Sequence, residues 1–163
     1  MSTRSKNLAC VVLVLILLGV STAAAWACTP PGVGTPGYWK NHPEAWPVEE
    51  IRIGGITYAR ADAIALMQTP GKGDKTYTLF RATVAALLNK RAGNDTSCPI
   101  TDRPSWTIQD VISKASWWLG EYPPGDGVKG NSDAWQDKGE WLYEWLDAYN
   151  NGLLCAPSRD QLE

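Results

Sequence analysis

Residues 74–91 read DKTYTLFRATVAALLNKR, and this stretch does most to decide the fold. Asp74 or Thr76 can cap the start of a helix here, and Gly93 follows its expected end at about Arg91. The large apolar residues recur at helical spacing and form one wide stripe; they are Leu79, Phe80, Val84, Leu87 and Leu88. This stripe predicts that the helix lies at the centre of the core.

Three further helices are expected, at residues 60–68, 107–119 and 133–149. In the second of these, Thr107 is followed three residues later by Asp110, which is the pattern of a capping box. Ser132 is the expected cap of the third. Between the last two helices, residues 122–131 are rich in proline and glycine and are interpreted as a loop.

A β-hairpin is predicted between residues 51 and 58, because Ile51-Arg52-Ile53 and Ile56-Thr57-Tyr58 alternate around Gly54-Gly55. Before it, residues 29–37 indicate an irregular lead-in, and Pro43 and Pro47 bracket one short helical turn. The expected fold class is therefore mainly α: a compact irregular bundle of about four helices carrying one small β-hairpin.

The chain begins with the pattern of a secretory signal peptide. Arg4 and Lys6 precede an apolar run of about 13 residues, shorter than the roughly 20 that span a bilayer. Ala25-Trp26-Ala27 places small residues where signal peptidase reads, so we expect cleavage before Cys28, with cleavage after Ala25 as the alternative. Residues 1–27 are then a signal peptide, and residues 28–163 form a single domain, secreted or at the cell surface, without a transmembrane anchor.

Three cysteines follow the expected cleavage site, an odd number in a compartment that permits disulfides. A bond between Cys98 and Cys155 is favoured, because each lies in a loop-like segment bordering a predicted helix. Cys28 would then be free, bonded to another chain or lipidated. Lipidation is disfavoured, because Ala25 and Trp26 depart from the residues that normally precede a lipid-bearing cysteine.

The charge of the chain gives no indication of a polyanionic partner. Charged residues make up 20% of the sequence and the formal net charge is −2. We therefore expect no binding to nucleic acid and no attraction to an anionic membrane.

Tryptophan is unusually frequent, with nine residues in the chain. Trp118, Trp135 and Trp145 fall on the apolar stripes of their helices and are expected in the core, whereas Trp117 and Trp141 fall off them. Exposed aromatic rings bind sugars and form interface hot spots. The candidate binding residues are Tyr38, Trp39, Lys40, His42, Trp46, Trp117 and Trp141.

His42 is the single histidine, which leaves little material for catalysis or metal binding. A site built on His42 and Glu44 lacks a further ligand, so packing at a helix start is the favoured interpretation and no catalytic residue, metal or cofactor is assigned. Calcium at Asp126, Asn131 and Asp133 is disfavoured, because their spacing does not fit a calcium loop. Asn94-Asp95-Thr96 matches an N-glycosylation acceptor in a predicted loop.

Several segments of the chain together resemble a known group of proteins. The most specific is GYWKNHPEAWP, from Gly37 to Pro47, and the others are Cys28-Thr29-Pro30, the hairpin at 55–58, the central helix at 74–91 and LDAYNNG at 146–152. The chain resembles a group of uncharacterised secreted proteins, mainly bacterial, whose mature part begins with a cysteine and contains this motif. The resemblance covers nearly all of residues 28–163 and implies export and a shared fold. It carries over no catalytic residue, and it indicates that Tyr38 to Trp46 matters, as a packing clasp or as a site.

Two functional interpretations follow. The first is an exported, tryptophan-rich extracellular or cell-envelope module with a non-enzymatic binding or structural role, whose partner is a glycan, a cell-envelope component or a protein. The second is a hydrolase or metal-dependent enzyme centred on His42 and Glu44. The lack of a catalytic constellation favours the first.

Overall fold

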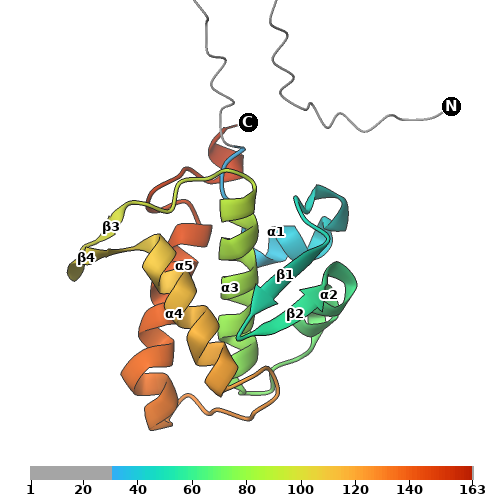
Figure 1. Ribbon diagram of the computed structural model, residues 1–163, viewed down its shortest axis with the longest axis vertical. Helices are drawn as coiled ribbons and strands as arrows, with labels where there is room; N and C mark the ends of the chain where they lie inside the picture. The colour runs from blue at the N-terminus through green and yellow to red at the C-terminus, as the bar shows by residue number, and fades with distance from the viewer. Residues whose placement is uncertain (1–30, 163) are drawn as a thin grey trace, which may run out of the picture.

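A computed structural model describes residues 31–162 of the chain (Figure 1), so the predicted signal peptide, its cleavage site and Cys28 lie outside the described residues. The α-helices are α1 (Pro36–Asn41), α2 (Arg60–Gln68), α3 (Lys75–Arg91), α4 (Ile108–Glu121) and α5 (Glu140–Asn150). The strands are β1 (Glu50–Ile53), β2 (Ile56–Ala59), β3 (Pro99–Ile100) and β4 (Arg103–Thr107). Shorter helical segments are η1 (Pro43–Ala45), η2 (Trp135–Gly139) and η3 (Arg159–Gln161).

Helix α3 forms the centre of the core, as its apolar stripe predicts. Figure 1 shows it between α4 and α5 on one side and β1, β2 and α2 on the other. Leu79, Phe80 and Leu88 are fully buried, and the small residues between them are buried too. Asp74 caps the helix by accepting a hydrogen bond from the Thr76 backbone N–H at 2.9 Å. Burial on nearly every side explains why one helix can organise the rest.

The start of α4 is fixed by the predicted capping box. The Thr107 hydroxyl accepts from the Asp110 backbone N–H, and the Asp110 carboxylate accepts from the Thr107 backbone N–H at 2.8 Å. The hydrogen bond from the Thr107 backbone, followed by that from its hydroxyl, lowers the pKa of Asp110. The contribution of this carboxylate to stability is therefore present above the ordinary pKa of aspartate and is lost as the pH falls through the lowered pKa.

Replacing Thr107 with alanine is expected to lower the free energy of unfolding by about 1 kcal/mol, because the first turn of α4 loses its side-chain acceptor. Urea denaturation monitored by circular dichroism measures this change. Ser113→Ala, an exposed substitution later in the same helix, is the control and should change stability by less than about 0.5 kcal/mol. Equal effects of the two substitutions would contradict the capping role.

The β1–β2 hairpin forms with the predicted turn. Ile53 pairs with Ile56, and Gly54 and Gly55 between them have φ values of +61° and +84°, which suit a tight two-residue turn. Gly54 also lies against Gly120 of α4, where an added Cβ would come within 2.7 Å of the Gly120 backbone nitrogen. The turn thus packs directly on the end of α4.

The fourth predicted helix is present over residues 133–150, but five of its residues form the π-helical segment η2. Gly139 permits this arrangement, because a Cβ there would lie 2.7 Å from the Trp135 ring and 3.1 Å from the Trp118 ring. Ser132 directly precedes the helix as predicted, and its carbonyl accepts from the Gln136 N–H at 2.9 Å. Its hydroxyl makes no capping bond and donates to the Lys129 carbonyl at 2.7 Å instead.

The predicted fold class, mainly α with a small hairpin, is confirmed, with two local differences. The short antiparallel pair β3–β4 was not expected, because its exposed, proline-containing sequence lacks the alternation of a buried strand. The expected turn at 43–47 is η1, and an unpredicted helix, α1, precedes it. Helix α1 starts at Pro36, inside the segment 29–37 that was expected to be irregular, and Thr35 is its cap. No helix within residues 31–162 is long and apolar enough to cross a membrane.

The two ends of the described chain meet at one end of the molecule (Figure 1). The Val33 backbone N–H donates to the Pro157 carbonyl at 2.9 Å, and the Arg159 N–H donates to the Val33 carbonyl at 3.1 Å. The favoured disulfide between Cys98 and Cys155 is present, with the two Cα atoms 5.3 Å apart. It fastens the segment after α5 to the segment that leads into β3.

Candidate functional site

The tryptophans of the GYWKNHPEAWP segment are core residues, so the expectation that they form an exposed surface is wrong. Trp39 is 0% exposed and Trp46 is 6% exposed. The Trp39 indole N–H donates to Asn89 Oδ1 at 2.9 Å, and the Trp46 indole N–H donates to the Trp39 carbonyl at 2.8 Å. Both polar groups therefore have partners: Trp39 anchors α1 to α3, and Trp46 fastens the residues after η1 to α1.

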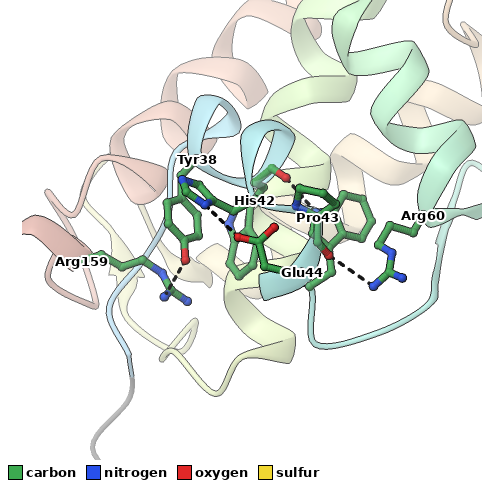
Figure 2. Close-up of polar contacts among 8 residues, drawn as sticks. Tyr38, His42, Pro43, Glu44, Arg60 and Arg159 are labelled. Atoms are coloured by element: carbon green, nitrogen blue, oxygen red, sulfur yellow. Dashed lines mark hydrogen bonds and ion pairs between the residues drawn. The ribbon is translucent and has the colours of Figure 1, made fainter. Parts of the chain in front are cut away.

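The polar residues of this segment lie on the surface over that anchor (Figure 2). The rings of Tyr38 and His42 stack with centroids 4.6 Å apart, and His42 Nδ1 lies 3.0 Å from Glu44 Oε1. Arg159 donates to the Tyr38 hydroxyl at 3.1 Å, and Arg60 donates to the Pro43 carbonyl at 3.3 Å. These contacts connect α1 and η1 to α2 and to the C-terminal segment, and they form a surface clasp.

The His42–Glu44 pair has little of the environment of a catalytic site. The side chains are 49% and 72% exposed, so water surrounds both. The pKa of Glu44 is lowered, first by a hydrogen bond from its own backbone N–H and then by the bond with His42. Within residues 31–162 no three histidine, cysteine, aspartate or glutamate side chains are grouped to hold a metal ion. Lys40 lies apart from the pair and lines a small hollow with Met67 and Arg81.

The glycosylation pattern and the loop at 122–131 both have structural roles. Asn94 is only 4% exposed, and its amide donates to the carbonyls of Gly32 and Asn89, so the folded chain offers no free amide there. Asp126 is exposed, and the loop around it is held by Asp74, whose carboxylate accepts from the Gly127 N–H at 3.0 Å.

The other two candidate tryptophans, Trp117 and Trp141, lie on helices α4 and α5, which Figure 1 shows across α3 from α2. They border a hollow of about 440 Å³, here named the aromatic pocket. Strand β4, helix α4, segment η2 and helix α5 all contribute to its wall, which is formed by Arg103, Trp106, Lys114, Trp117, Trp118, Asp137, Lys138, Trp141 and Leu142. Trp117 and Trp141 therefore line one hollow, whereas the ring of Tyr38 contacts those of Trp39 and His42, so the candidate aromatic residues do not form a single surface.

The rings of the aromatic pocket are held in defined orientations. Trp141 donates its indole N–H to Asp102 Oδ2 at 2.7 Å and meets Trp106 edge to face, with centroids 5.9 Å apart. Trp118 is buried at the base, and its N–H donates to the Ala134 carbonyl at 3.1 Å. Trp117 is 56% exposed and stands free at the rim. Such a fixed aromatic wall needs little reorganisation to receive a ligand.

Trp117 also borders two neighbouring hollows. One lies toward the β1–β2 turn and includes Gly54 and Ser116, and the other lies toward Tyr122 and Asp133. The exposed ring of Trp117 therefore borders three hollows. A ligand longer than the aromatic pocket could stack on this ring and extend into either neighbouring hollow.

Three cations lie in the wall of the aromatic pocket, and two of them lie over its rings. The Arg103 guanidinium carbon lies 4.5 Å from the centroid of Trp141 and 5.4 Å from that of Trp106, and Lys114 Nζ lies 5.6 Å from that of Trp106. Lys138 completes the set on η2. The ion pairs found within residues 31–162 join other groups, so none of these three cations is within ion-pair distance of a carboxylate there, although the charge of Lys114 contributes, after the hydrogen bonds from Thr107, to the lowered pKa of Asp110.

Sequence reasoning missed Trp106 and the three cations, although the sequence contains a signal for two of them. Lys114 stands three residues before Trp117, and Lys138 stands three residues before Trp141. Residues three apart are neighbours on a helix surface, so each pair presents a cation beside a ring. Arg103 and Trp106 belong to the unexpected strand β4, and only the folding of that strand over α4 brings them to the pocket.

Comparisons of the chain with known protein families, with curated proteins and with solved structures find no match.

Proposed function

We propose that the chain is a non-enzymatic binding module of the cell exterior or envelope that holds a glycan in the aromatic pocket. The observation that carries this proposal is the exposed ring of Trp117 at the rim of a hollow of about 440 Å³ that Trp106 and Trp141 also line. The Cys98–Cys155 disulfide is compatible with an oxidising compartment outside the cytoplasm.

The shape and composition of the pocket favour a sugar over a protein partner. The pocket volume lies in the range typical of small-ligand sites. Its apolar rings alternate with Lys114, Asp137 and Lys138, so ring faces and hydrogen-bonding groups are offered side by side. A pyranose presents the same combination, because it has an apolar C–H face and a rim of hydroxyls. The hot spots of a protein–protein interface, in contrast, are mostly found at its centre, where water is excluded and charged residues are few.

Replacing Trp117 with alanine is expected to weaken glycan binding at least tenfold, because the ligand loses its stacking platform; tenfold corresponds to about 1.4 kcal/mol. A glycan array identifies the ligand, and isothermal titration calorimetry measures the two affinities. The melting temperature should change little, since the ring is mostly in water.

Leu153→Ala, which removes another exposed apolar side chain at a different place on the surface, is the matched control and should bind like the unaltered protein. Absence of binding to every glycan tested, or unchanged affinity in Trp117→Ala, would overturn the proposal. Capture of a protein with the same dependence on Trp117 would replace it with a protein-binding function.

An enzyme centred on His42 and Glu44 is the alternative proposal, supported by the 3.0 Å contact between their side chains. It is the weaker one, because both side chains are exposed and the pair is already engaged in the surface clasp. His42→Ala separates the two proposals. An active-site role requires the substitution to abolish turnover of a substrate, whereas the pocket proposal requires glycan affinity to stay unchanged.

A further inference from the structure

We infer that the glycan bound in the aromatic pocket carries an anionic group, and that Arg103, Lys114 and Lys138 select it. This inference rests on the proposed function and adds the chemical class of the ligand. It starts from a local excess of positive charge. The chain has a formal net charge of −2, yet the wall of the pocket contains three cations and one carboxylate residue, Asp137, with Asp102 hydrogen-bonded to Trp141 beside it.

The placement of Arg103 prepares it to bind an anion. Its guanidinium lies over the rings of Trp141 and Trp106, at 4.5 Å and 5.4 Å from their centroids. Stacking on aromatic rings fixes the plane of the group while leaving its N–H edges able to donate. A planar guanidinium held in this way matches the geometry of a carboxylate, a sulfate or a phosphate.

The two lysines bring charge to the same rings from the helices. Lys114 and Lys138 each precede a pocket tryptophan by three residues, which puts them about one turn away on the same face of α4 and of the η2–α5 helix. A sugar unit held against Trp106 and Trp141 therefore lies beside these cations. None of the three cations is neutralised by an ion pair within residues 31–162.

The neighbouring hollow limits where that negative charge can lie. On the Tyr122 side of Trp117 the surface includes Glu121, Asp133 and Asp137, with Lys138 as the one basic residue lining it. A ligand charged along its whole length would meet carboxylates there, which is unfavourable. The arrangement suits a saccharide that carries its anionic group on the unit held against Trp106 and Trp141.

The test compares matched oligosaccharides by calorimetry at low and at physiological salt. The probes are oligosaccharides bearing one uronate unit, the same compounds as methyl esters, and sulfate-bearing oligosaccharides with their desulfated counterparts. We expect the charged member of a pair to bind at least tenfold tighter at low salt, with a smaller ratio as salt rises. Preference for the uronate or for the sulfate identifies which anionic group the pocket reads.

Each of the substitutions Arg103→Gln, Lys114→Gln and Lys138→Gln should lower the affinity for the charged member. The three combined should bring it down to the affinity for its neutral counterpart. Binding of the neutral member should weaken by a smaller factor, because it loses a polar contact of the wall but no charge interaction. Arg52→Gln and Lys90→Gln, which remove exposed cations outside the pocket, serve as controls and should retain the full preference. Circular dichroism verifies that every variant is folded.

The outcomes separate the two levels of the proposal. Equal binding of charged and neutral members, with a strong dependence on Trp117, overturns the anionic ligand and leaves the glycan-binding function standing. A charge preference that survives all three pocket substitutions also overturns the inference. Failure of both members of every pair to bind overturns the proposed function and this inference with it.

Discussion

Asn89→Leu is expected to lower the free energy of unfolding by on the order of 5 kcal/mol, the largest effect of any single substitution considered. Asn89 is fully buried on α3. Its Oδ1 accepts from the Gly34 N–H at 2.7 Å and from the Trp39 indole N–H at 2.9 Å. Its Nδ2 donates to the Gly34 carbonyl and to Asn150 Oδ1, each at 2.9 Å.

Leucine has nearly the same shape as asparagine but satisfies none of these bonds. Four buried polar groups from three segments of the chain would lose a partner at once, at roughly 1–3 kcal/mol each before relaxation. Urea denaturation measures the loss. Asn131→Leu, at an exposed loop position, is the control and should be nearly neutral. A loss below about 1 kcal/mol in Asn89→Leu would contradict the network.

Removing the disulfide is expected to lower the free energy of unfolding by a similar amount. The effect arises in the unfolded chain, whereas that of Asn89→Leu arises in the folded one. Cys98 and Cys155 are 57 residues apart in sequence, and opening a loop of that length releases chain entropy worth about 4 kcal/mol in the unfolded protein. The double substitution Cys98→Ala with Cys155→Ala should therefore lower the melting temperature by roughly 15 °C. Differential scanning calorimetry measures the shift.

All samples for this comparison carry Cys28→Ser, so that exchange with a third thiol does not confuse the result. Reduction of the otherwise unaltered protein is the matched control, and it should bring the melting temperature to that of the double variant. A reduced protein that melts at the temperature of the oxidised one would show that the crosslink contributes nothing to stability.

The elements that could be predicted from the sequence are those whose signals are local. The apolar stripe and the Asp74 cap fix α3, the capping box at Thr107 fixes α4, and Gly54-Gly55 fixes the hairpin turn. The π-helical segment η2 could not be foreseen, because it depends on Trp118 from another helix packing against Gly139.

In the candidate site, too, residues with a local sequence signal could be predicted, and residues placed by tertiary contacts could not. Trp39 stands in a segment rich in proline and glycine that looks exposed, and only its hydrogen bond to Asn89, fifty residues later, places it in the core. The exposure of Trp117 could be predicted, because this residue falls off the apolar stripe of its own helix. Its companions from β4 could not be found, since their position depends on a strand that the sequence pattern does not indicate.

The pairing of Val33 with Ser158 has a practical consequence for how the molecule can be displayed. Both ends of the described chain leave from one tip, whereas the end of α4 and the start of the helix at residue 133 lie at the opposite tip in Figure 1. If the protein were attached to a support or a surface at either end, the tip that contains the end of α4, with Trp117 in its last turns, would point away from the attachment and remain accessible.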